Sequence, residues 1–231
     1  MTRKPRAPFF VVNPKAYLYG KQSLDLALYA DKLAAEYDID IIFTVQHADA
    51  YRVSQATNNL FVCAQHMDGI VSGRGMGHIL PESLVEAGIA ATFLNHAEHP
   101  QTLEELVKAI KRAREVGILT IACANSIAEA QSIALLGPDI MVCEPTELIG
   151  TGKVSDVSYM KSTNQAVKDI NSDVMVLQAA GISTVADVLQ ALNSGAEATG
   201  GTSGIVAADN PKKILTEMIQ AVAQWKKENK S

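Results

Sequence analysis

Asp139-Ile140-Met141-Val142-Cys143 is a short apolar run that leads directly into Glu144-Pro145-Thr146-Glu147-Leu148-Ile149-Gly150-Thr151-Gly152. Such a run, without alternating polar residues, is typical of a strand that is buried on both faces of a parallel sheet. Glu144 follows at the end of this strand. Proline then restricts the backbone, and the two glycines further on permit many conformations. The stretch therefore predicts a parallel strand with a carboxylate base at its tip, followed by a short flap.

The same kind of run recurs along the whole chain and alternates with helical patterns. The eight predicted strands cover residues 9–13, 39–44, 60–64, 90–94, 119–123, 139–143, 174–179 and 196–202. Predicted helices cover 23–37, 102–116, 126–136, 157–171, 184–194 and 211–227, with a weak helix at 48–56 and a short one near 82–87. Eight alternating units predict an α/β fold, a (β/α)8 barrel, with an open doubly wound sheet as the second choice. No linker interrupts the pattern, so residues 1–231 are expected to form a single domain.

Composition narrows the range of partners. The chain has 231 residues, of which 48% are hydrophobic, and this is enough to bury one large core. The net charge is −5, and residues of both signs are distributed along the chain without a basic stripe. This distribution argues against a nucleic-acid partner. No apolar run approaches the ~20 residues needed to cross a bilayer, so neither a membrane span nor a signal peptide is expected. The basic residues 1–7 are expected to form a loose tail.

The three cysteines, Cys63, Cys123 and Cys143, each lie in or near a predicted strand. Their spacing suits neither a zinc site nor a disulfide framework, which indicates buried thiols in a reducing cytoplasm. The sequence carries no visible metal cluster, phosphate-binding P-loop or dinucleotide fingerprint, so no metal or organic cofactor is expected.

Polar residues collect where the predicted strands end, and in a (β/α)8 barrel these ends share one rim. The first strand ends in Asn13-Pro14-Lys15, the fourth in Asn95-His96-Ala97-Glu98 and the sixth in Glu144. The seventh leads into Gly181-Ile182-Ser183, and the eighth contains Gly200-Gly201. Taken alone, each feature has a structural explanation, such as a surface charge for Lys15, a core histidine for His96 or a helix cap for Glu144. Together they predict one polar site at the barrel mouth.

These segments, in this order, resemble the triosephosphate isomerase family, and especially its shorter archaeal-type form. The matching stretches are Asn13-Pro14-Lys15, Ala64-Gln65-His66-Met67-Asp68, Gly77-His78-Ile79-Leu80-Pro81-Glu82, Leu94-Asn95-His96-Ala97-Glu98, Glu144 through Gly152, Ala180-Gly181-Ile182-Ser183-Thr184 and Gly200-Gly201-Thr202-Ser203. They span nearly the whole chain, and the Glu-Pro…Gly-Thr-Gly segment is the most specific. The resemblance implies a TIM barrel that interconverts D-glyceraldehyde 3-phosphate and dihydroxyacetone phosphate through an enediolate, a reaction of glycolysis and gluconeogenesis.

The resemblance also implies a role for each matched residue. Glu144 would be the base and His96 a neutral proton donor, while Lys15 and Asn13 would stabilise negative charge on the substrate. The phosphate would lie on the backbone of Gly181, Ser183, Gly200 and Gly201, with Gly150 in the closing flap. Glu98 and Gln65 would orient Lys15, although a helix cap for Glu98 and a core hydrogen bond for Gln65 are equally compatible with the sequence.

Several positions depart from the family pattern and leave other readings open. Ala97 and Met76 replace a serine and a threonine, Ala179-Ala180 stands where glycine is common, and His99-Pro100 replaces an arginine-bearing stretch. The alternatives are an isomerase of another short ketose phosphate, such as a tetrulose phosphate, or a phosphosugar-binding protein with little turnover. The resemblance further implies a homodimer or a homotetramer.

Overall fold

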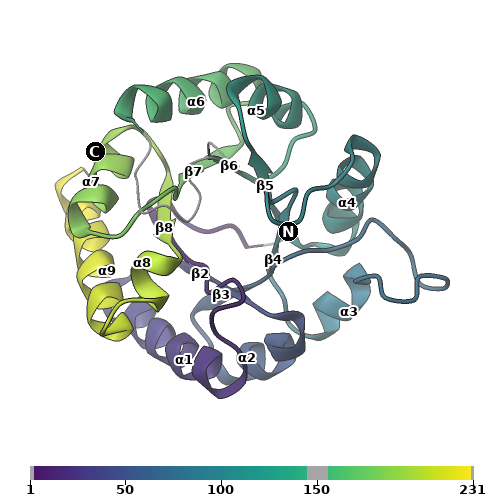
Figure 1. Cartoon of the computed structure of the whole chain (residues 1–231), viewed down its shortest axis with the longest axis horizontal. Helices are drawn as coiled ribbons and strands as arrows, with labels where there is room; N and C mark the ends of the chain where they lie inside the picture. The colour runs from purple at the N-terminus through teal and green to yellow at the C-terminus, as the bar shows by residue number, and fades with distance from the viewer. Residues whose placement is uncertain (1–2, 145–155, 230–231) are drawn as a thin grey trace.

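Eight parallel strands form a closed barrel in the computed structural model, which describes residues 3–144 and 156–229 (Figure 1). The strands are β1 (Phe9–Val12), β2 (Ile41–Val45), β3 (Leu60–Ala64), β4 (Ala91–Leu94), β5 (Leu119–Ala124), β6 (Ile140–Cys143), β7 (Met175–Gln178) and β8 (Ala198–Gly201). The barrel closes because β1 pairs with β8, with Phe9 opposite Ala198 and Val12 opposite Gly201. This pairing confirms the (β/α)8 barrel and excludes the open doubly wound sheet.

Helices surround the strands in a ring (Figure 1). They are α1 (Gly20–Tyr37), α2 (Ala50–Ala56), α3 (Pro81–Glu86), α4 (Leu103–Val116), α5 (Ile127–Ala134), α6 (Val157–Ile170), α7 (Val185–Asn193), α8 (Ser203–Val206) and α9 (Pro211–Glu228), with a 3-10 turn at His47–Asp49. The short helix α8 directly after β8 was not predicted. Among the described residues, no helix has the length and apolar character of a membrane span.

The core has two layers because side chains alternate between the two faces of each strand. Phe9 and Val11 of β1 point into the barrel, where they pack with Ile42, Phe61 and other inward side chains. Phe10 and Val12 point outward into the layer between the strands and the helices. Burial on both faces explains why the strands read as continuous apolar runs.

The basic residues near the N-terminus differ from the loose tail that the sequence predicts. Arg6 donates hydrogen bonds to Asp40 from both its backbone and its guanidinium, and Arg3 forms a further ion pair with Asp40 at 3.1 Å. Lys4 pairs with Asp139 at 3.0 Å. Asp40 is buried, and burial alone would raise its pKa, but the hydrogen bonds from Arg6 lower that pKa below its usual value. The segment from Arg3 is therefore attached by charge to the residues at the start of β2 and β6.

Two helices begin with a reciprocal capping box. At α4, Glu105 N–H donates to the Thr102 hydroxyl and Thr102 N–H donates to the Glu105 carboxylate. Thr184 and Asp187 form a second box at α7, which was not predicted. Asp187 also accepts hydrogen bonds from Ser183, and these contacts change the phosphate site described below.

Candidate active site

A cavity of about 130 Å³ opens at the carboxyl ends of the strands. Its lining includes most of the polar residues predicted at the strand ends, namely Asn13, Lys15, His96, Glu98, Glu144, Gly181 and Gly201. These residues follow or belong to five different strands, so the barrel gathers groups that lie far apart in the sequence. The prediction of one shared polar site at the barrel mouth therefore agrees with the geometry.

Lys15 has an unusual backbone conformation, with φ of 45° in a region that residues with a Cβ adopt at a cost. Its N–H donates to Asn13 Oδ1 at 3.0 Å, and its Nζ lies 2.6 Å from Glu98 Oε1. The Lys15 side chain is 17% exposed, whereas the side chain of Glu98 is 57% exposed. Glu98 thus holds the ammonium group from the solvent side of the cavity.

Asn13 is oriented by the same local network. Its Oδ1 accepts both the Lys15 N–H and the hydroxyl of Thr44, the latter at 2.6 Å. Because the oxygen of the amide already has two donors, Nδ2 is the atom that can donate to a bound molecule.

The His96 imidazole is held in a defined neutral form. The backbone N–H of Glu98 donates to His96 Nδ1 at 3.1 Å, so Nδ1 carries a lone pair and Nε2 carries the proton. Burial lowers the pKa of His96, and the positive charge of Lys15 lowers it further, although Glu98 opposes this shift. This hydrogen bond comes from the turn at Glu98, before α4 begins at Leu103.

Asn95 shapes that turn, a role that was not predicted from the sequence. It adopts φ of 56°, and its Nδ2 donates to Cys123 O at 3.0 Å and to Glu129 Oε1 at 3.2 Å. Gln101 and Asn95 exchange hydrogen bonds between backbone and side chain. The signal available in the sequence was an asparagine directly before a candidate histidine, since asparagine tolerates the left-handed region better than most residues.

Glu144 directly follows β6, and its N–H donates to Ala124 O at 3.0 Å. Burial raises the pKa of Glu144 to about 7, with Lys15 lowering it and Glu98 raising it. A carboxylate with such a pKa takes up and releases a proton near neutral pH. The flap that follows it was predicted from Pro145 to Gly152, so the flap and the predicted substrate contact Gly150 lie outside the described residues.

The opposite side of the cavity is formed by the loops after β7 and β8. Gly181 has φ of 70° and lines the cavity together with Ile182, Gly201, Thr202 and Ser203. Of the predicted phosphate contacts, Gly181 and Gly201 therefore lie at the cavity. Thr202 and Ser203 are additional lining residues that the prediction did not include as contacts.

Gly200 and Ser183 are not among the lining residues of this cavity. A Cβ on Gly200 would lie 2.2 Å from Val11 O, so this glycine is needed for the close approach of β8 to β1. The Ser183 N–H and hydroxyl both donate to Asp187 Oδ2, at 3.0 and 3.2 Å. In this conformation, the backbone donor expected from Ser183 is already used by the capping box of α7.

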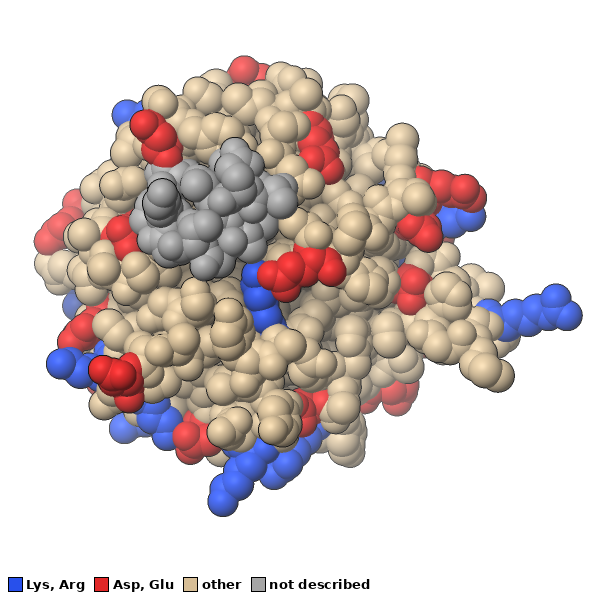
Figure 2. Space-filling view, viewed as in Figure 1, with Lys and Arg blue, Asp and Glu red and all other residues tan. Residues whose placement is uncertain are grey.

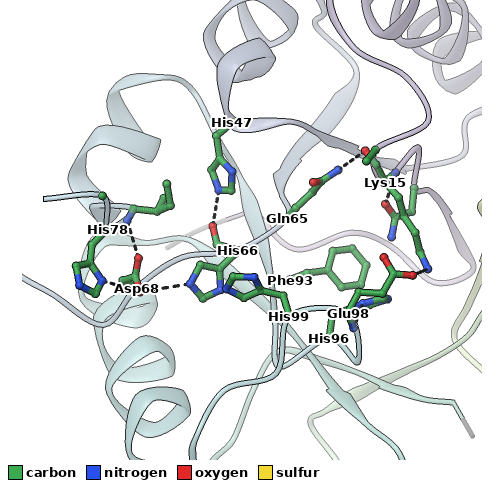
Figure 3. A pocket seen from close by; sticks show the side chains of 14 residues that line it. Lys15, His47, Gln65, His66, Asp68, His78, Phe93, His96, Glu98 and His99 are labelled. Carbon is green, nitrogen blue, oxygen red and sulfur yellow. Dashed lines mark hydrogen bonds and ion pairs between the residues drawn. The ribbon is translucent and has the colours of Figure 1, made fainter. Parts of the chain in front are cut away.

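A second, larger chamber of about 520 Å³ adjoins the first (Figure 3). The two share Asn13, Lys15, Phe93, His96 and Glu98, and Gln65 lines the larger chamber. All five histidines of the chain line it, namely His47, His66, His78, His96 and His99.

Contacts join four of these histidines around Asp68. His66 Nε2 and His78 Nδ1 lie 3.4 and 3.1 Å from Asp68 Oδ1, and the His66 and His99 rings lie 4.2 Å apart (Figure 3). His47 contacts the carbonyl of His66 through its ring. No group of three or more metal-binding side chains among the described residues is arranged to hold an ion. The histidine chamber is a tertiary feature that was not predicted from the sequence.

Acidic and basic side chains are interspersed around the face seen in Figure 2. In the described part of this face they form no continuous basic stripe. The cationic group of the cavity, Lys15, is paired with Glu98. The site is therefore suited to a small anion rather than to a long polyanion.

Fold and site together place the protein among the (β/α)8-barrel enzymes that act on small polar substrates at the ends of their strands. The family model described as triosephosphate isomerase matches residues 8–218. The chain belongs to the triosephosphate isomerase family.

Curated archaeal proteins named triosephosphate isomerase align over almost their whole length. That of Methanobacterium bryantii is 37% identical over 96% of this chain and 100% of its own. That of Methanosarcina mazei is 38% identical over 94% of this chain and 99% of its own. That of Methanocaldococcus jannaschii is 37% identical over 92% and 99%, respectively.

Proposed function

We propose that this protein interconverts D-glyceraldehyde 3-phosphate and dihydroxyacetone phosphate by moving a proton between adjacent carbons through an enediolate. The observation that carries this proposal is the shared cavity of Glu144, His96 and Lys15 beside the backbone of Gly181 and Gly201. A pocket that only bound a phosphosugar would need the ammonium and the backbone amides. It would have no need of a carboxylate with a raised pKa.

Glu144 is the proposed base that removes the proton next to the substrate carbonyl. General bases work best when their pKa lies near the operating pH, because they are then both ionised and basic enough to accept a proton. Burial places the pKa of Glu144 at about 7, close to that optimum. An exposed glutamate, with a pKa near 4, would be a weaker base.

His96 is the proposed donor to the substrate oxygens. Its Nε2–H is the free end of an imidazole whose Nδ1 is occupied by the Glu98 N–H. The lowered pKa of His96 keeps the ring neutral, so it donates one proton and then accepts another without accumulating charge. The Lys15 ammonium and Asn13 Nδ2 stabilise the negative charge that develops on the oxygen of the enediolate.

The phosphate is proposed to bind at the side of the cavity formed by Gly181 and Gly201. (β/α)8 barrels commonly bind phosphate at the loops after strands seven and eight, where glycine lets the backbone approach an anion closely. Gly200 and Ser183 were included in the predicted phosphate site, but the packing of Gly200 and the hydrogen bonds of Ser183 to Asp187 favour the narrower assignment.

A coupled assay with the purified protein tests this function in both directions. The proposal requires turnover of both triose phosphates without added metal, and equilibrium must be approached from either side. Binding of a phosphate-bearing substrate analogue without turnover would contradict the enzyme proposal and favour a binding protein. Faster turnover of a tetrulose phosphate in a parallel assay would instead assign a different substrate.

The pH profile should depend on Glu98. In the free enzyme, kcat/KM should fall as the pH drops through about 7, because Glu144 becomes protonated. Glu98→Gln removes an anion that raises the pKa of Glu144, so the acidic limb should move to lower pH. The substrate phosphate also titrates, near pH 6, but this substitution does not change its pKa. A limb that stayed in place would therefore belong to the substrate and not to Glu144.

The protein is further proposed to form at least a homodimer through the histidine chamber. The loop before α3 extends away from the barrel (Figure 1) and carries the exposed side chains of Val71 and Met76. A second copy of this loop is the proposed occupant of the chamber, because the loop contributes Gly77, His78 and Ile79 to the chamber wall and also carries exposed apolar side chains. Whether two such dimers form a tetramer, and whether the protein is cytoplasmic, stay predictions.

Met76→Asp should weaken this association. The Met76 side chain is fully exposed, so the substitution should leave the fold of the subunit intact while placing a charge in the interface. Sedimentation velocity at micromolar concentration should show a dissociation constant raised on the order of 30-fold or more. Leu28→Asp, at an exposed position of α1, is the matched control and should sediment as the unmodified protein. A wild-type monomer, or an unchanged dimer in the Met76 variant, would contradict the proposed interface.

A further inference from the structure

The strained backbone of Lys15 is held at both ends by side chains that belong to or follow β1, β2 and β3. At its N–H, Lys15 donates to Asn13 Oδ1, and the buried Thr44 of β2 fixes that oxygen from the other side. At its carbonyl, Lys15 accepts hydrogen bonds from Gln65 at 2.7 Å and from Gln46 at 3.2 Å. Figure 3 shows the contact between Gln65 and the Lys15 backbone.

Gln46 and Gln65 are also joined to each other. Gln46 Nε2 donates to Gln65 Oε1 at 2.9 Å, so one amide group of Gln46 contacts both Gln65 and Lys15. Gln46 directly follows β2 and Gln65 directly follows β3. Within the described residues, every hydrogen bond recorded for the Gln46 side chain goes to this unit. The hydrogen bonds of the Gln46 side chain are therefore those of a group that supports Lys15.

We propose that Gln46 is a positioning residue, which keeps Lys15 in its left-handed conformation and so keeps the ammonium group in the cavity. The inference rests on the proposed role of Lys15 in the isomerisation. A residue with a Cβ at φ of 45° tends to relax to a more favourable backbone angle unless its surroundings prevent this. Rotation about the backbone at Lys15 would swing its long side chain away from His96 and Glu144.

Replacing a positioning residue and replacing a residue that only stabilises the fold have different effects on activity and on the unfolding temperature. If Gln46 holds strain, its loss lets the strain relax, and the protein loses activity without losing stability. If Gln46 only supports the fold, the unfolding temperature falls and kcat changes little. The Gln46 side chain is partly exposed. When it is replaced, water can therefore become the hydrogen-bond donor to Lys15 O and Gln65 Oε1.

The test uses Gln46→Met, which keeps the side-chain length and removes the donor. We expect kcat/KM to fall about tenfold, and on the order of a hundredfold when Gln65→Met is added, since small misplacements of a catalytic group have large effects. The midpoint of thermal unfolding should stay unchanged or rise. Gln131→Met, at an exposed position of α5, is the matched control and should change neither quantity.

A double-mutant cycle with Lys15 separates this inference from the proposed function. In a Lys15→Met background, Gln46→Met should cause no further loss of activity, because the group that it positions is already absent. The positioning role is overturned if Gln46→Met lowers activity equally in both backgrounds, or if it lowers the unfolding midpoint while kcat/KM stays within twofold. If Lys15→Met itself leaves activity intact, the proposed function of Lys15 fails instead.

Discussion

Replacing Lys15 with methionine should lower kcat by about 10²–10³-fold, which is the usual effect of removing one preorganised group that stabilises developing charge. Methionine keeps most of the length and the apolar stem, so the loss reports on the ammonium. The binding of anionic substrate analogues should weaken as well, because Lys15 is the cation that lines the cavity in the described structure. Steady-state kinetics and titration calorimetry measure the two effects separately.

Two further measurements show whether the loss of activity in Lys15→Met comes from the missing positive charge. Lys15 lowers the pKa values of both His96 and Glu144, so the acidic limb of the residual activity should move to higher pH in the Lys15→Met enzyme. Lys21→Met, an exposed position of α1, is the control for loss of one positive charge and should behave as the unmodified protein. Near-normal activity of Lys15→Met would remove its electrostatic role from the proposed mechanism.

Replacing Glu144 with aspartate should lower kcat by about 10²-fold or more, while KM and the unfolding midpoint change little. The substitution keeps the charge and withdraws the carboxylate by one methylene, and a displacement of about 1 Å is enough to cause a loss of this size. Single-turnover proton exchange between substrate and solvent measures the affected step directly. Glu36→Asp on the exposed side of α1 is the matched control.

The stability of Glu144→Gln provides an independent check on the base. The pKa of Glu144 is about 7 in the folded protein and near 4.3 in an unfolded chain, so folding is penalised once the pH exceeds the unfolded value. The penalty is complete above pH 7 and absent below about pH 4. Glu144→Gln should therefore raise the unfolding midpoint at pH 8 and leave it unchanged at pH 4. Equal effects at both values of pH would show that Glu144 does not carry a raised pKa.

The elements of the barrel could be predicted from the sequence because each one depends on local patterns. A parallel strand buried on both faces reads as an apolar run, and the amphipathic helices between the strands read as periodic ones. The predicted strand at 60–64 matches β3, and most other ends differ by one or two residues. Lys15, His96 and Glu144 could be predicted to share one site, because the ends of parallel strands in one barrel meet at one rim.

The sequence thus determined the barrel, the rim and the family, because these follow from residues that are close along the chain or from their order. The tertiary structure alone decided how the site is completed. It placed the Glu98 N–H on His96 Nδ1, gave the Ser183 N–H to Asp187, and brought Gln46 and Gln65 to the carbonyl of Lys15. It also gathered all five histidines around one chamber. Such contacts depend on barrel closure and on the paths of individual turns. No periodic pattern in the sequence records which donor reaches which acceptor across neighbouring strands.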